Sequence, residues 1–125
     1  MSKKILIVED DRSLQSALAI TLEKHHYVTS SAFDGEAGLA AAEKEKPDLI
    51  LLDIILPKKD GFAFMAAMQE NPAIASIPVI VLTNLEDSAD IERALGLGAR
   101  TFLVKTNYKL EEIAEKIEQT LQQTQ

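Results

Sequence analysis

The sequence contains no cysteine, which excludes disulfide bonds and thiolate metal sites and leaves the redox compartment open. Positive charge is also scarce: 13 Lys and Arg residues stand against 20 Asp and Glu residues, and the net charge is −7. This balance argues against a surface that binds nucleic-acid phosphates and against a surface that binds an anionic membrane. We therefore expect no direct nucleic-acid binding.

Long apolar runs are missing as well. No run approaches the roughly 20 residues that a membrane-spanning helix needs, and the first residues, MSKKILIVEDD, lack the apolar core of a signal peptide. We expect a cytoplasmic protein without membrane contact. The sequence shows no linker and no internal repeat, so residues 1–125 are expected to form one domain.

The apolar residues, 46% of the chain, occur in short blocks. The unbroken run Leu49–Leu52 predicts a strand covered on both faces of a sheet, because such a strand is apolar at every position, and similar short apolar runs predict three further strands. A fifth block, YVTSSA, is more polar and predicts a strand nearer the sheet edge. The expected strands are Ile5–Val8, Tyr27–Ala32, Asp48–Asp53, Val79–Thr83 and Thr101–Val104.

A helical pattern follows each predicted strand. In the first, Leu14, Leu18 and Leu22 recur four residues apart and form one core-facing stripe. The expected helices are about Ser13–Lys24, Glu36–Lys46, Gly61–Glu70, Ser88–Leu95 and Leu110 to about Gln122. Five strands that alternate with five helices predict an α/β fold with a doubly wound parallel sheet, helices on both faces and right-handed crossovers.

Polar side chains stand at the carboxyl ends of four of these strands. Glu9 and Asp10 follow the first strand, Asp53 ends the third, Thr83 ends the fourth and Lys105 follows the fifth. The carboxyl ends of parallel strands share one edge of the sheet, which is where ligands of such folds bind. We therefore expect these side chains to converge.

Three carboxylates brought together repel each other. A pair at about 4 Å costs on the order of 4 kcal/mol at an effective dielectric constant of 20. Lys105 supplies one compensating charge, and a divalent cation would supply two more. Oxygen ligands favour Mg²⁺, Mn²⁺ or Ca²⁺, and Mg²⁺ keeps coordination positions open for a phosphoryl group. A carboxylate can attack phosphorus to give an aspartyl phosphate, which Mg²⁺, an ammonium and a hydroxyl would stabilise.

Each of these residues also has an ordinary structural explanation. Acids after the first strand can cap the following helix or complement its dipole, and this is the role that we prefer for Asp11. A lone aspartate can begin a turn, a lone threonine can cap one, and a lone lysine is normally solvated. The combination of four strand ends with compatible chemistry favours the functional interpretation.

Four motifs in order resemble the response-regulator receiver domain of two-component signalling: ILIVEDD, LLDIILPKKDG, VIVLTN and FLVK. The resemblance covers essentially all 125 residues. It implies the flavodoxin-like (βα)5 fold with strand order 2-1-3-4-5. It also implies that Asp53 is the phosphoacceptor, that Lys105 binds the phosphoryl group, and that Mg²⁺ is held by Asp53, Glu9, Asp10 and the main-chain carbonyl of Ile55.

The same resemblance implies a switch and its partners. Thr83 and Phe102 would be coupled switch residues, although Phe102 is also compatible with a static aromatic side chain. The phosphodonor would be a histidine kinase or a phosphotransfer protein. The changing surface would be the fourth helix, fifth strand and fifth helix, for an output protein that the sequence does not identify. A weak phosphorylation-dependent dimer is a further expectation.

One departure from the family concerns the residue after the lysine, where the family often has a proline in a cis peptide. Here it is Thr106, and a cis bond to a residue other than proline costs about 3–4 kcal/mol. The loop is therefore either trans or strained.

Two other functions stay open: a receiver-like binding module that is never phosphorylated, and a Mg²⁺-dependent phosphatase of the haloacid-dehalogenase type. The phosphatase would need a second aspartate where Ile55 stands.

Overall fold

The structure is a computed structural model that describes residues 2–123. Five parallel strands form one sheet in the order β2-β1-β3-β4-β5. The predicted doubly wound, flavodoxin-like fold is confirmed. No helix within the described part of the chain is long and apolar enough to cross a membrane. The elements are β1 (Lys4–Val8), α1 (Arg12–Lys24), β2 (Val28–Ala32), α2 (Gly35–Glu45), β3 (Leu49–Leu52), α3 (Gly61–Gln69), β4 (Val79–Thr83), α4 (Ser88–Gly96), β5 (Thr101–Val104), the 3₁₀ helix η1 (Lys105–Asn107) and α5 (Leu110–Gln123).

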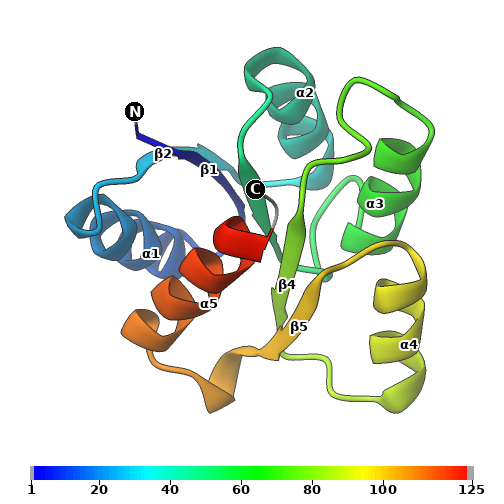
Figure 1. Cartoon of the computed structure of the whole chain (residues 1–125). Coiled ribbons are helices and arrows are strands. Elements are labelled where there is room, and N and C mark those ends of the chain that lie inside the picture. The colour runs from blue at the N-terminus through cyan, green and yellow to red at the C-terminus, as the bar shows by residue number, and fades with distance from the viewer. Residues whose placement is uncertain (1, 124–125) are drawn as a thin grey trace.

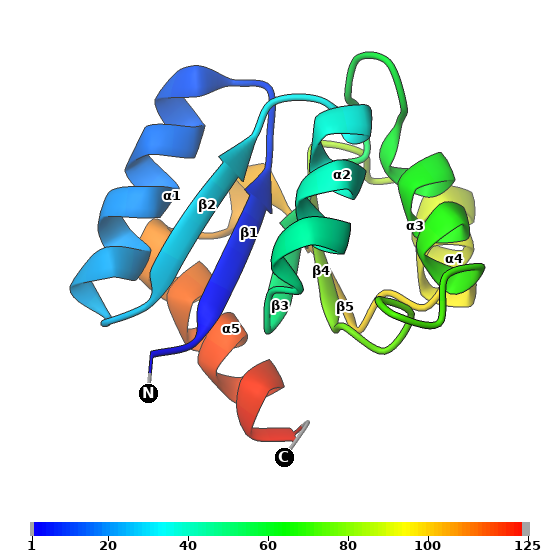
Figure 2. The same cartoon turned by 90° about the horizontal axis from the view of Figure 1, so that it is seen from above.

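The helices cover both faces of the sheet. Figure 1 shows α1 and α5 on one side of the strands and α2, α3 and α4 on the other, and Figure 2 shows the same three layers from above. Each face has its own apolar cluster, because successive residues of a strand point to opposite faces. Leu6 and Ile50 lie under α2–α4, whereas Ile7 and Leu51 lie under α1 and α5. Strands buried on both faces explain the continuous apolar runs.

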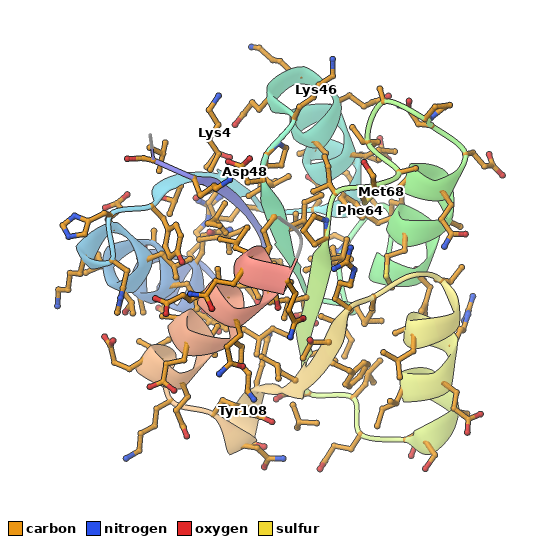
Figure 3. The ribbon with its side chains drawn as sticks, in the orientation of Figure 1. Lys4, Lys46, Asp48, Phe64, Met68 and Tyr108 are labelled. Atoms are coloured by element: carbon orange, nitrogen blue, oxygen red, sulfur yellow. The ribbon has the colours of Figure 1, made fainter. Side chains whose placement is uncertain are left out.

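The start of α3 lies against the end of β3. The Asp60 side chain caps the helix, and the next residue, Gly61, approaches the backbone closely: a Cβ there would lie 2.6 Å from the carbonyl oxygen of Asp53. Only glycine fits that approach. Phe64 and Met68 lie between α3 and the sheet (Figure 3) and are 0% and 3% exposed. The packing of α3 therefore fixes the backbone beside Asp53.

Several predicted boundaries differ from the structure by one residue, and local contacts explain two of these differences. The expected strand Asp48–Asp53 is one residue shorter at each end. Asp48 instead accepts the backbone N–H of Lys4 at 2.7 Å, and both residues lie near the starts of β1 and β3 (Figure 3). The second helix ends before Lys46, which has a left-handed backbone with φ of 47°. Such a residue ends a helix and lets the chain turn into the following strand.

α1 begins immediately after Asp11, whose side chain accepts the N–H of Leu14 at 3.1 Å, so the expected capping role of Asp11 is confirmed. Leu18 and Leu22 are buried as predicted, but Leu14 is only partly buried. The next residue, Gln15, lies in the core instead and is 3% exposed. The buried face of α1 is therefore centred on Gln15, Leu18 and Leu22 and not on Leu14, Leu18 and Leu22 as predicted.

α4 and α5 are attached to the sheet very differently. α4 buries Ala94 alone among its nine residues and leaves Leu95 47% exposed. Its Arg93 guanidinium lies 4.1 Å from the centre of the Phe62 ring of α3, a favourable cation–π contact. α5, in contrast, buries five residues: Ile113, Ala114, Ile117, Thr120 and Leu121. Of the two helices that flank β5, α4 is therefore the more weakly anchored.

Candidate functional site

The carboxyl ends of the parallel strands lie at one edge of the sheet (Figure 1), and the predicted site residues stand at or directly after these ends. Val8 pairs in register with Leu52, so the next residues, Glu9 and Asp53, leave neighbouring strands side by side. The Asp53 N–H donates to the Val8 carbonyl at 3.0 Å and extends this pairing by one bond. The β1–β3 register therefore sets the relative position of the two acids.

The structure brings Glu9, Asp10 and Asp53 together: each offers a carboxylate oxygen, and the three atoms lie within 4.8 Å of one another. Glu9 and Asp53 are 2% and 4% exposed, whereas Asp10 is exposed. Buried carboxylates are rare unless they are paired or hydrogen-bonded. The partners of the two buried acids therefore define the site.

Lys105 is the main partner of both. Its Nζ lies 2.7 Å from Glu9 Oε1 and 2.8 Å from Asp53 Oδ2, and its side chain is only 18% exposed. Burial alone would lower the pKa of the ammonium, but the hydrogen bonds to Asp53 and Glu9 and their charges outweigh it, so the pKa is raised. Lys105 is therefore a partly buried bridge between two acids rather than a fully solvated lysine.

Glu9 sits in a less favourable environment. Burial raises the pKa of its carboxyl above the ordinary value, and the charge of Asp53 raises it further. The hydrogen bond from Lys105 opposes this rise, as does the Asp11 N–H, which donates to Glu9 Oε2 at 2.9 Å. The opposing contacts do not cancel the effect of burial, so the charged form of Glu9 remains disfavoured.

Asp53 is held from two directions. Its Oδ2 accepts from Lys105, and its Oδ1 accepts the backbone N–H of Ile55 at 3.2 Å. The Ile55 side chain is 57% exposed. The backbone of residue 55 is thus next to the carboxylate, at the position where a phosphatase of the haloacid-dehalogenase type would carry its second acid.

Thr83 is the last residue of β4 and is fully buried, at 0% exposed. Its hydroxyl Oγ1 makes no hydrogen bond to any residue in the range 2–123. It therefore does not cap the following turn, which was the structural alternative. A buried hydroxyl without a partner costs about 1–3 kcal/mol, so Thr83 Oγ1 is an unpaired donor at the carboxyl edge of the sheet.

Phe102 lies on β5 opposite Val81 of β4, two residues before the pair of Thr83 and Val104. Because alternate residues of a strand share a face, Thr83 points to the same face as Val81, the face covered by α2–α4. Phe102 is partly buried against the same apolar cluster. Both predicted switch residues therefore face the side of the sheet that carries α4.

The peptide after Lys105 is trans, because the described residues contain no cis peptide bond. β5 passes directly into η1, a short 3₁₀ helix over Lys105–Asn107 that the sequence pattern did not predict. Thr106 therefore occupies the usual place of proline without the strain of a cis bond.

Two features of the site were missed at the level of the sequence. Gln15 donates hydrogen bonds to the backbone beside Glu9, and the Arg12 guanidinium lies 4.3 Å from the centre of the Phe33 ring, just beyond β2. A signal for Gln15 was present: residues 15, 18 and 22 have the spacing of one helix face, and two of them are leucine. Because glutamine is polar, the sequence pattern did not predict that Gln15 is buried.

The residues present fit a divalent cation. The acid cluster offers only oxygen ligands, as Mg²⁺ prefers, and Lys105 supplies one positive charge against the three carboxylates of Glu9, Asp10 and Asp53. Two negative charges remain uncompensated, which matches the charge of one divalent ion. The exposed Asp10 leaves the cluster open to solvent on one side.

Residues 5–118 match the family model described as the response regulator receiver domain. The chain belongs to this family. Among curated relatives, the alkaline phosphatase synthesis transcriptional regulatory protein PhoP of Bacillus subtilis is 39% identical over 105 residues, 84% of this chain and 43% of that protein. The DNA-binding dual master transcriptional regulator RpaA of Synechocystis sp. is 36% identical over 121 residues, 97% of this chain and 50% of that protein.

Solved receiver structures share the fold over nearly the whole chain. A response regulator receiver domain protein (CheY-like) from Methanospirillum hungatei is 27% identical with a TM-score of 0.92, and the match covers 99% of this chain and 97% of that one. The chemotaxis protein CheY4 of Vibrio cholerae is 27% identical with a TM-score of 0.88, over 95% and 98% of the two chains. The receiver chain spans half or less of the two curated relatives named above.

Proposed function

We propose that this receiver domain accepts a phosphoryl group on Asp53 in a Mg²⁺-dependent reaction and thereby acts as a signalling switch. The observation that carries the proposal is the placement of Lys105, which bridges Asp53 and Glu9 at 2.8 and 2.7 Å inside a cluster of three acids. A cluster of this charge is suited to a cation and a transferred anion rather than to structural stability.

In the proposed transfer, a carboxylate oxygen of Asp53 attacks phosphorus, and the bond from phosphorus to the donor breaks. The leaving group, an imidazole nitrogen if the donor is a phosphohistidine, keeps the electron pair of that bond. Lys105 moves from the carboxylate to the phosphoryl oxygens, and the unpartnered Thr83 hydroxyl donates to one of them. Mg²⁺ on Glu9, Asp10, Asp53 and the Ile55 carbonyl would add positive charge beside the phosphoryl group.

The proposed donor is a histidine kinase or a phosphotransfer protein, and the proposed location is the cytoplasm. The domain's own net charge of −7 supports an output through protein contacts rather than through direct binding to nucleic acid. The output protein is not identified by the residues of this chain. A weak phosphorylation-dependent dimer through α4, β5 and α5 fits the same proposal.

The proposed output is a shift between two packings of α4, β5 and α5. A phosphoryl group on Asp53 draws the Thr83 hydroxyl toward it, which opens space for Phe102 to move inward. Two observations support this path: both side chains face the α4 side of the sheet, and α4 buries only Ala94. Phe102 has no hydroxyl, so its two positions differ in packing alone.

Labelling tests the phosphoacceptor. Incubation with acetyl phosphate and Mg²⁺ should label the wild-type protein, and the label should be released by base and by hydroxylamine, as from an acyl phosphate. Asp53→Asn should abolish labelling. Asp87→Asn is the matched control, because Asp87 stands before α4 and its side chain makes no capping hydrogen bond. Equal labelling of Asp53→Asn and the wild type would assign the phosphoryl group to another residue.

Amide chemical shifts with and without beryllofluoride, a stable phosphoryl mimic, test the output. Large changes should extend from Thr83 through α4 to Phe102 and the first half of α5. The proposal for this surface fails if the changes are confined to the loops that follow Asp10, Asp53 and Lys105.

Lys105→Ala should disturb the response to beryllofluoride more than the affinity for Mg²⁺, because its proposed partner is the phosphoryl group.

A further inference from the structure

Gln15 is a buried polar side chain whose position is explained by what its amide nitrogen donates. It lies in the first half of α1, is 3% exposed, and sits on the helix face that carries Leu18 and Leu22. Glutamine is seldom buried to this degree without hydrogen-bond partners. Its Oε1 has none among the described residues, so only the nitrogen accounts for the burial.

The nitrogen Nε2 of Gln15 faces three backbone carbonyls. It lies 3.0 Å from the Ile7 oxygen, 3.1 Å from the Ala32 oxygen and 3.3 Å from the Glu9 oxygen. Two hydrogens serve three acceptors, so one hydrogen is shared. The orientation of the amide is unambiguous, because the reversed amide would point its oxygen at three carbonyl oxygens. One side chain thus joins the carboxyl ends of β1 and β2.

These contacts fix the backbone of Glu9 from both sides. Glu9 lies beyond the last residue of β1 in the register, so the strand ladder does not hold its carbonyl. Its carbonyl takes the Gln15 amide instead, while its N–H donates at 3.0 Å to the Ala32 carbonyl, which the same amide also contacts. A substitution at Gln15 would therefore free the carbonyl of Glu9 and leave three buried acceptors with fewer donors.

The fixed backbone matters because the environment of the Glu9 carboxylate is unfavourable for its charged form. It is buried beside the negative charge of Asp53, and its own contacts are Lys105 at 2.7 Å and the Asp11 N–H at 2.9 Å. A metal ion would compete with Lys105 for the same oxygen. If that contact is lost, the Asp11 N–H on Oε2 and the Gln15 amide on the backbone carbonyl are the contacts that still hold Glu9 toward the cluster.

We propose that Gln15 is a positioning residue for the cation site, which holds the Glu9 backbone so that its carboxylate points into the acid cluster. The inference rests on the proposed Mg²⁺ site. Gln15 itself contacts no ligand atom of that site and acts only through Glu9. Two of the three amide bonds end on strand residues, Ile7 and Ala32, so a substitution at Gln15 also lowers stability, and the positioning role is tested by the Mg²⁺ affinity of the folded protein.

The first test compares Mg²⁺ affinities by isothermal titration. Gln15→Met keeps an unbranched side chain of similar length but removes the donor, and it should weaken Mg²⁺ binding about tenfold. The control is Leu22→Ala, which removes a buried side chain two turns further along the same helix and none of the Gln15 hydrogen bonds. Its folded form should bind Mg²⁺ with wild-type affinity. Equal affinities of Gln15→Met and the wild type would overturn the positioning role.

A second measurement needs no substitution. In the ¹⁵N-labelled wild-type protein, the side-chain amide signals of Gln15 should exchange slowly with solvent and should shift on addition of Mg²⁺, with the same midpoint as the backbone amide of Asp11. If the Asp11 signal titrates and the Gln15 signals stay unchanged, Gln15 is a structural residue only. This readout holds even if Gln15→Met does not fold.

The outcome also separates this inference from the proposed function. Glu9→Gln and Asp53→Asn should each weaken Mg²⁺ binding if the acid cluster is the cation site. If neither does so, the proposed metal site is wrong. If both do so while Gln15→Met binds Mg²⁺ as the wild type does, only the role of Gln15 is wrong.

Discussion

The interior of the sheet buries apolar side chains, whereas the carboxyl edge buries the carboxylates of Glu9 and Asp53, and the two kinds of burial have opposite effects on folding free energy. Along β3, residues Leu49–Leu52 are apolar and at most 1% exposed, and the very next residue, Asp53, is charged and 4% exposed. Burial of each large apolar side chain contributes roughly 1.5–3 kcal/mol to folding. Burial of each carboxylate is unfavourable unless its partners compensate for the lost hydration.

The difference shows that stability and the candidate site depend on different regions of the domain. The interior supplies the stability that holds three acids within 4.8 Å, and the edge keeps charge that the fold itself does not fully compensate. Burial, with a smaller effect from the charge of Asp53, raises the pKa of Glu9, so the fold disfavours the charged form of this carboxyl. Removal of an acidic charge at the edge should therefore stabilise the fold, whereas removal of an interior apolar side chain or of Lys105 should destabilise it. Four predictions test this, from the largest expected effect to the smallest.

In the interior, Ile50→Ala should lower the free energy of unfolding by about 3–4 kcal/mol, because Ile50 is 0% exposed and the truncation leaves a cavity. Urea unfolding measures the loss. The Mg²⁺ affinity of the folded fraction should stay unchanged, since no part of the acid cluster is touched. A loss below 1 kcal/mol would show that the interior is not the stabilising region.

At the edge, Lys105→Met should destabilise the protein by about 2 kcal/mol at pH 7, because Glu9 and Asp53 lose their shared ammonium. The pKa of Lys105 is raised, so its contribution is fully present below the ordinary value of 10.5 and is lost as the pH rises through the higher folded value. The difference between variant and wild type should therefore narrow only above pH 10.5. The exposed Lys109→Met is the control and should show no such difference.

Glu9→Gln should act in the other direction and stabilise the metal-free protein at pH 7. We expect a melting temperature about 3–5 °C higher, on the order of 1 kcal/mol. The folded state disfavours the Glu9 charge, so the destabilisation in the wild type grows as the pH rises from 4.5 through the raised pKa, and it is absent below 4.5. Thermal melts of the two proteins should converge near pH 4.5. A gain that persists at lower pH would point to a cause other than charge.

Asp10→Asn should have the smallest effect on stability, because Asp10 is exposed and its charge is already hydrated. The melting temperature should change by less than about 2 °C, upward if at all. The affinity for Mg²⁺, in contrast, should fall about tenfold in calorimetric titration. An unchanged affinity would place the cation elsewhere and would remove Asp10 from the proposed ligand set.

Much of this arrangement was predictable from the order of the residues. Unbroken apolar runs such as LILL can be satisfied only by strands covered on both faces, and the alternation with helices then requires a parallel sheet. Parallel strands present their carboxyl ends at one edge, so the convergence of Glu9, Asp53 and Lys105 follows from their places after the runs. The strand order 2-1-3-4-5 did not follow from alternation, and it came from the resemblance to receiver domains.

Only the tertiary structure decided which partner each polar atom takes. Local sequence does not determine that one Lys105 ammonium bridges two acids from different strands, that the Thr83 hydroxyl has no partner in the described chain, or that Gln15 lies in the core. The physical reason is that helix and strand patterns depend on neighbours a few residues apart. Hydrogen bonds and ion pairs at the edge join residues up to 96 positions apart, as Glu9 and Lys105 do, and depend on register and packing that the whole sheet sets.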